Sequence, residues 1–209
     1  MTNPIRAMVF DADGVIVRPR TWFVHAAERT YRIPRAEFMG FIHGDFKRCT
    51  TGELELSEVL PPLLERWQVN VGVDAFIRQW LIHEHALDIN LLERIARIRA
   101  RGMPCYLGTN QERHRAAYMR RDMGLQDALD GVFASSDLGV RKPDAAFYER
   151  VQEALHLEPH QILFWDDAAQ NVEAARAVGW QAELYTGLRG FDQHLLHRFG
   201  WRRGARAAP

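Results

Sequence analysis

The chain has 209 residues, of which 47% are hydrophobic and 26% are charged. This length and composition allow one well-packed core, or one core with a smaller subdomain. The 27 basic and 27 acidic side chains cancel, so no overall charge favours nucleic acid or an anionic membrane as a partner. No apolar segment is long enough to span a bilayer, and the two cysteines, Cys49 and Cys105, lie far apart. We therefore expect a reduced cytoplasmic protein without nucleic acid or membrane partners.

A buried strand is expected near the start of the chain, in the apolar run over residues 7–10, and Asp11, Asp13 and Gly14 follow it. Carboxylates at the carboxyl end of a parallel strand lie where open α/β sheets bind ligands. Gly14 permits the bend that turns both carboxylates toward one point. An ordinary surface turn is the alternative, since Asp and Gly are common turn residues. A calcium loop fits less well, because its alternating oxygen ligands and terminal Glu are missing.

A helical insertion is expected over residues 19–88, which show apolar residues at helical spacing and no clear strand,. The polar segment 43–52, with a glycine near each end, predicts a loop between two of these helices. Ser57 is the expected cap of the helix that follows this loop. His83 and His85 lie on different faces of a helix, which favours surface positions over a metal site.

Strand and helix patterns alternate from residue 89 onward. Asn90 is the expected cap of a helix over residues 91–101. Further strands are predicted over residues 103–107, 131–134, 161–165 and 181–185, and further helices over 112–123, from Pro143, and over 168–178,. This alternation predicts a Rossmann-like α/β core with a parallel sheet covered on both faces. We assign residues 1–18 and 89–200 to this core, 19–88 to a helical cap subdomain and 201–209 to a flexible tail.

Polar side chains follow four of the predicted strands at their carboxyl ends. The right-handed crossover rule places these ends along one edge of the sheet. The residues brought together there are Asp11, Thr109, Lys142, Asp166 and Asp167. Carboxylates without a counter-charge would repel one another, so a divalent cation is expected, and oxygen ligands favour Mg²⁺.

This set of groups is typical of phosphoryl transfer. Asp11 can attack phosphorus to form an aspartyl phosphate, and Asp13 can protonate the leaving alkoxide and then activate water. The Thr109 hydroxyl, the Asn110 backbone amide and Lys142 can bind the phosphoryl oxygens.

The order of four motifs resembles the signatures of the haloacid dehalogenase superfamily: Asp11-Ala12-Asp13-Gly14-Val15, Thr109-Asn110, Lys142-Pro143, and Asp166-Asp167 with Asn171. The resemblance covers nearly the whole chain and implies the same nucleophile, acid/base, hydroxyl and lysine roles.

The resemblance also implies roles in metal binding. It makes Asp167 the direct ligand, with the backbone carbonyl of Asp13 facing the metal beside Asp11. Asp166 would act through water or pair with Lys142, and Asn171 would support the site. An acid at position 13 implies phosphate rather than halide chemistry.

A closer resemblance rests on Gly52-Glu53-Leu54, on the run from Ser136 to Asp144, and on Phe164-Trp165-Asp166-Asp167. These segments are similar to the bacterial sugar-phosphate phosphatase branch, which includes alpha-glucose-1-phosphate phosphatase and the phosphatase domain of epoxide hydrolases. We expect a magnesium-dependent phosphomonoesterase, a monomer or weak homodimer, acting on a small phosphorylated metabolite, with sugar phosphates favoured.

Within the cap, His43, Asp45, Lys47 and Arg48 are the candidate substrate-binding residues, because they lie in the predicted polar loop. Simple solvation of Lys47 and Arg48 is the alternative. A phosphomutase would use the same aspartyl phosphate and return the group to the sugar. A catalytically silent binding module is the third possibility, but every charged group that the mechanism requires is present.

Overall fold

The computed structural model describes residues 5–201. Its centre is a parallel sheet of five strands: β1 (Ala7–Phe10), β2 (Cys105–Thr109), β3 (Gly131–Ala134), β4 (Ile162–Asp166) and β5 (Gln181–Leu184). The strand order is β3-β2-β1-β4-β5, so the first strand of the chain lies in the middle. Phe10, the last residue of β1, pairs with Leu107 of β2 and Trp165 of β4. The predicted α/β fold is confirmed.

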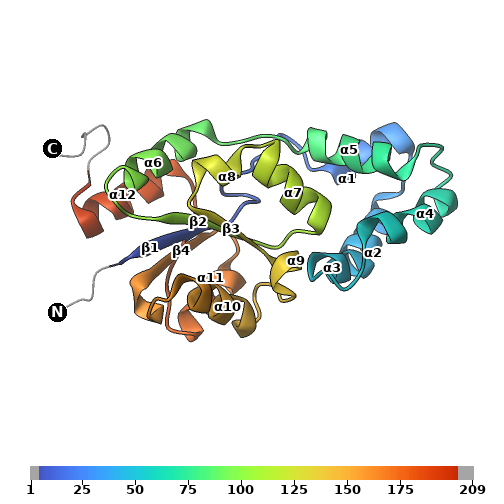
Figure 1. The fold of residues 1–209 in the computed structure, drawn as a ribbon. Coiled ribbons are helices and arrows are strands. Elements are labelled where there is room, and N and C mark those ends of the chain that lie inside the picture. The colour runs from blue at the N-terminus through green and yellow to red at the C-terminus, as the bar shows by residue number, and fades with distance from the viewer. Residues whose placement is uncertain (1–4, 202–209) are drawn as a thin grey trace.

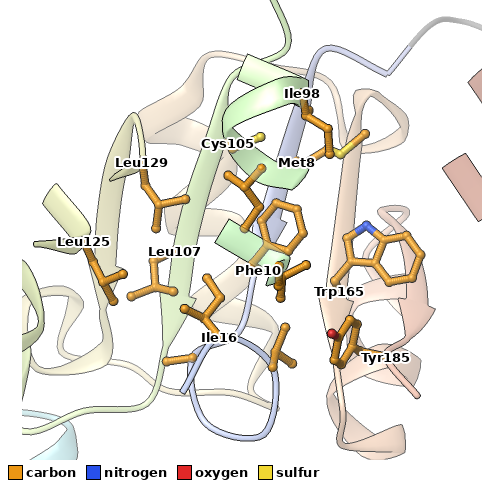
Figure 2. Close-up of a cluster of buried hydrophobic side chains, with 14 of the residues drawn as sticks. Met8, Phe10, Ile16, Ile98, Cys105, Leu107, Leu125, Leu129, Trp165 and Tyr185 are labelled. Carbon is orange, nitrogen blue, oxygen red and sulfur yellow. The ribbon is translucent and has the colours of Figure 1, made fainter. Parts of the chain in front are cut away.

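Helices cover both faces of the sheet (Figure 1). The bounds of these helices are α6 (Ile89–Arg99), α7 (Arg113–Arg121), α8 (Leu125–Ala128), α9 (Ser135–Leu138), α10 (Ala145–Leu155), η1 (Pro159–Gln161), α11 (Ala169–Ala177) and α12 (Leu188–Phe199). Alternate side chains of β1 point to opposite faces, as in any strand. Met8 and Phe10 join the cluster under α6 and α12 (Figure 2), whereas Val9 joins the cluster under α10 and α11.

A helical subdomain is inserted between β1 and α6. It contains α1 (Phe23–Tyr31), α2 (Arg35–His43), α3 (Asp45–Thr50), α4 (Leu56–Arg66) and α5 (Val73–His83). These helices bury a cluster of their own, rich in aromatic rings and separate from the two clusters beside the sheet. The two linkers to the core are hydrogen-bonded to each other, because Arg18 N donates to Ala86 O and Asp88 N to Ile16 O. The two linkers that join the subdomain to the core therefore run side by side.

Several local predictions were wrong. The segment predicted as a loop over residues 43–52 contains α3, which is favoured by Asp45 in its first turn and by Lys47 and Arg48 in its last turn,. The cap of α6 is Asp88, whose Oδ1 accepts from the backbone N–H of Leu91 at 3.1 Å, so Asn90 lies inside the helix.

Other element ends also differ from the predictions. Ser57 lies within α4, which begins at Leu56 and also contains Pro61 and Pro62. The structure adds the short helices α8 and α9, and α12 after the last strand. Leu188, Phe191 and Leu195 of α12 have the helical spacing that would have predicted it,.

The structure describes both cysteines and the first residue of the predicted tail. Cys49 and Cys105 are free and buried. No helix within residues 5–201 has both the length and the apolar character needed to cross a membrane. Trp201 stacks on Phe199 with a ring separation of 4.5 Å, so packing extends to the first residue of the predicted tail. The remaining residues of that tail, 202–209, lie outside the described part of the chain.

Candidate active site

Three neighbouring strands deliver the polar residues of the site to one edge of the sheet. Asp11 directly follows β1, Asp166 ends β4 and Asp167 follows it, while Thr109 ends β2 on the other side of β1. Each of Asp11, Asp166 and Asp167 has a carboxylate oxygen within 4.8 Å of those of the other two. The convergence expected from the motif order is therefore present in the structure.

Lys142 is the counter-charge at the centre of this cluster. Its Nζ donates to Asp11 Oδ1 at 2.7 Å and to Asp166 Oδ2 at 2.6 Å, and only 2% of the residue is exposed. Burial works to lower the pKa of Lys142, but the two carboxylates outweigh it and raise that pKa,. Lys142 therefore stays charged and links the strand ends of β1 and β4.

The Asn110 side chain holds the backbone of Lys142. Asn110 Nδ2 donates to Lys142 O, and Lys142 N donates to Asn110 Oδ1, both at 2.9 Å. The peptide bond between Lys142 and Pro143 is cis. Asn110 therefore has a positioning contact through its side chain, in addition to the backbone amide that the sequence offered for phosphoryl binding.

Asp166 and Asp167 have different surroundings. Asp166 is fully buried and accepts from Lys142, from Asn171 Nδ2 at 3.0 and 3.1 Å, and from Ala168 N at 2.8 Å. Asp167 is exposed, and a Cβ at Gly14 would lie 2.0 Å from its Oδ2. Asp166 is thus committed to protein partners, whereas Asp167 is free to meet a ligand, and Gly14 leaves the room for it.

Burial and neighbouring charges raise the pKa values of Asp11 and Asp167. Burial, together with the charges of Asp166 and Asp13, raises the pKa of Asp11 to about 7 despite its pairing with Lys142,. Burial and the charge of Asp166 also raise the pKa of Asp167. Three carboxylates against one lysine leave an excess of negative charge, and their oxygens are the type that Mg²⁺ prefers. The residues present therefore fit a divalent cation.

Asp13 points into a second network. Its Oδ2 accepts from Gln111 Nε2 at 2.9 Å and its Oδ1 from Arg115 Nη2 at 2.7 Å. Gln111 Nε2 also lies 3.3 Å from Thr109 Oγ1. The side chain of Asp13 is not part of the carboxylate cluster, so its predicted role at the metal would depend on its backbone carbonyl.

This network reaches the helical subdomain through Glu84, which follows α5. Arg115 Nη1 pairs with Glu84 Oε2 at 2.5 Å, and Glu84 Oε1 accepts from the backbone N–H of Phe23 at 2.9 Å. Both charged residues are buried, and burial raises the pKa of Glu84. Gln111, Arg115 and Glu84 were not predicted from the sequence. One signal was available for Arg115, which occupies the buried face of α7 with Met119, four residues later,.

The cap residues predicted to bind substrate are not at this site. His43, Asp45, Lys47 and Arg48 are exposed. Arg48 pairs with Glu53 at 2.7 Å and with Asp45 at 3.6 Å. A cavity of about 320 Å³ beside Asp13 is lined instead by Asp13, Trp22, Val24, His25, Arg35, Phe38, Met39, Ile42, Glu84 and Arg115. The subdomain meets the site through α1, α2 and Glu84. Its helix α3, which carries Lys47 and Arg48, packs on α9 instead, where Ser135 Oγ donates to Thr50 O.

Three curated relatives match parts of the chain. The Sesquiterpene phosphatase astK of Aspergillus oryzae is 34% identical over 92 residues, which are 44% of this chain and 47% of that protein. The Bifunctional epoxide hydrolase 2 of Sus scrofa is 26% identical over 84% of this chain and 35% of that protein. The Phosphorylated carbohydrates phosphatase of Thermotoga maritima is 24% identical over 84% of this chain and 82% of that protein. The chain thus spans half or less of the length of the first two.

The fold matches solved structures of the same kind. A HAD family enzyme from Bacteroides thetaiotaomicron, in complex with magnesium and inorganic phosphate, superposes with a TM-score of 0.74 at 17% identity, covering 86% of this chain and 93% of that one. The family model of haloacid dehalogenase-like hydrolases matches residues 5–179. The resemblance inferred from the four motifs is confirmed, and the chain belongs to the haloacid dehalogenase-like hydrolase family.

Proposed function

We propose that this protein is a magnesium-dependent phosphomonoesterase that works through an aspartyl phosphate on Asp11. The observation that carries the proposal is the pairing of a buried Asp11, held by Lys142, with a second acid two residues later that faces a cavity. The phosphatases among the matched relatives and the magnesium and phosphate of the Bacteroides enzyme support it.

In the first half of the reaction, a carboxylate oxygen of Asp11 forms a bond to phosphorus and the ester P–O bond breaks. Asp13, in its protonated form, gives its proton to the departing alkoxide. Lys142 and the Thr109 hydroxyl balance charge on the phosphoryl oxygens. Because Gln111 and Arg115 hold both oxygens of Asp13, the acid is fixed on the cavity side of the nucleophile.

In the second half, Asp13 takes a proton from water, and the water oxygen attacks phosphorus. The bond between phosphorus and Asp11 breaks, and inorganic phosphate and the free carboxylate result. Asp11, Asp167 and the backbone carbonyl of Asp13 would hold Mg²⁺, which when bound would neutralise the carboxylates and polarise the phosphoryl group. Asp166 would contribute by fixing Lys142 rather than as a direct ligand, because its oxygens already accept four hydrogen bonds.

The substrate is proposed to be a small phosphorylated metabolite. The names of the matched relatives include both a carbohydrate and a sesquiterpene phosphatase, so sugar phosphates and less polar esters both belong in a first substrate panel. His43, Lys47 and Arg48 are surface residues outside the cavity, so the sequence-based proposal that they bind substrate has no support from the cavity lining.

The test is phosphate release from sugar phosphates, nucleotides and simple phosphoesters, with Mg²⁺, with EDTA, and with the Asp11→Asn variant. We expect release that needs Mg²⁺ and disappears in the variant. Turnover by folded Asp11→Asn at the wild-type rate would refute the nucleophile. Isomerisation of a sugar phosphate without release of phosphate would instead indicate a phosphomutase.

A further inference from the structure

The cavity beside Asp13 is the place where the leaving group of the substrate must lie. Asp13 is the proposed proton donor to the departing alkoxide, so that oxygen must sit within reach of its carboxylate. The cavity begins at Asp13 and Arg115 of the core and continues between α1 and α2 of the helical subdomain. The chemistry of its lining therefore selects the alcohol half of the phosphate ester.

Most polar groups at the base of this cavity already have partners in the protein. Asp13 accepts from Gln111 and Arg115, and Arg115 also pairs with Glu84. Glu84 in turn accepts from the backbone of Phe23. Among the polar side chains of the cavity lining, those of His25 and Arg35 and the indole N–H of Trp22 have no hydrogen bond or ion pair to the rest of residues 5–201.

The remaining walls are apolar. Five of the lining side chains are apolar or aromatic: Trp22, Val24, Phe38, Met39 and Ile42. A sugar leaving group would place several hydroxyls against these walls with only three free polar groups, on Trp22, His25 and Arg35, to meet them. A buried hydroxyl without a partner loses its hydrogen bonds to water and gains none in return. An apolar leaving group gains from the same surface.

The volume sets the size of the group that fits. The cavity of about 320 Å³ is about twice the 150 Å³ that accommodates benzene in an apolar protein cavity. It is also at the lower end of ordinary ligand sites. This volume corresponds to a leaving group of about a dozen non-hydrogen atoms.

We propose that the enzyme prefers phosphate monoesters of apolar alcohols of up to about this size, with at most one polar substituent for Arg35 and His25 to meet. The inference rests on the proposed phosphatase function and narrows its substrate class. This substrate class differs from the sugar phosphates that the sequence favoured, because it is inferred from the side chains that line the cavity and not from the motifs.

A matched pair of substrates tests this preference. Cyclohexylmethyl phosphate and glucose 6-phosphate both carry the phosphate on a methylene attached to a six-membered ring, and they differ mainly in the ring hydroxyls and ring oxygen. We expect kcat/KM at saturating Mg²⁺ to be at least about tenfold higher for the cyclohexylmethyl ester. From ethyl to butyl to hexyl phosphate, kcat/KM should rise up to about fourfold for each added methylene.

Two variants of the lining and one control locate the effect. Met39→Gln keeps the length of the side chain but adds an amide, and should reduce the preference for the cyclohexylmethyl ester by roughly fivefold with little change for ethyl phosphate. Ile42→Thr should act in the same direction and serves if Met39→Gln folds poorly. Met103→Gln is the control, since Met103 is also partly buried but packs on the cluster beside the sheet, away from the cavity.

The outcomes separate the two proposals. Hydrolysis of ethyl phosphate together with a kcat/KM for glucose 6-phosphate equal to or above that for the cyclohexylmethyl ester would overturn the substrate class and leave the phosphatase standing. An unchanged preference in both folded lining variants would also overturn it. If folded wild-type protein hydrolyses no ester of the set with Mg²⁺, the phosphatase assignment fails, and this inference falls with it.

Discussion

Replacing Asp11 by Asn should make the metal-free protein more stable at alkaline pH while it abolishes turnover. In the folded protein burial and neighbouring acids raise the pKa of Asp11 from 3.8 to about 7. The folded state therefore holds the proton more tightly than the unfolded chain. As pH rises from about 4 to about 7, the contribution of Asp11 to the free energy of unfolding of the wild type falls, and it reaches its lowest value above about 7.

The size of the effect follows from that rise. About three pKa units at 1.36 kcal/mol each correspond to about 4 kcal/mol,. Asn resembles the neutral acid in shape and still offers an oxygen to Lys142. We expect the free energy of unfolding of Asp11→Asn to exceed that of the wild type by about 1–2 kcal/mol at pH 5 and by up to about 4 kcal/mol at pH 8.5.

Urea unfolding in EDTA at the two pH values measures this difference. Adding Mg²⁺ at pH 8.5 should remove much of it, because the cation binds the ionised site of the folded wild type. Asp130→Asn is the control with the opposite sign, since Asp130 pairs with Arg99, accepts from Cys105 N and has a lowered pKa. The reasoning would be refuted if Asp11→Asn and the wild type had the same free energy of unfolding, or if their difference were the same at both pH values.

Three further predictions concern the groups around Asp11. Lys142→Met leaves two buried carboxylates without their counter-charge and should lower the free energy of unfolding by about 3–5 kcal/mol in urea at pH 8; a loss below about 1 kcal/mol would contradict the buried pairing. Gly14→Ala places a Cβ 2.0 Å from Asp167 Oδ2 and should abolish the rise in Tm with Mg²⁺, whereas Gly102→Ala, with the same left-handed φ (+80° against +83°) and open space, should keep it. Glu84→Gln weakens the hold of Arg115 on the acid/base and should slow alcohol release in a single turnover about tenfold or more for ethyl phosphate but barely for p-nitrophenyl phosphate, whose leaving group needs no proton; equal losses in this first step for both esters would show that Glu84 does not assist proton donation by Asp13.

The core of the fold could be predicted because its signals are local. In β1 each residue is apolar, as expected for a strand covered on both faces,. Each acidic motif directly follows such a run, and the crossover rule then brings the strand ends to one edge. The cluster of Asp11, Lys142 and Asp166 follows from these local patterns and this rule, although their pairing distances do not.

The sequence by itself thus determined the parallel sheet, the edge that carries the chemistry and the acids that meet there, since each depends on spacing along the chain. Only the tertiary structure decided which charges are buried and which surface receives the leaving group. Arg115 and Glu84 look like ordinary surface charges in the sequence, and they are buried because α5 and α7 pack together beside Asp13. Lys47 and Arg48 lie in a polar segment that suggests a binding loop, yet that segment forms a helix that packs on α2 and α9. Contacts between residues distant in the chain make these choices, and no local pattern records them.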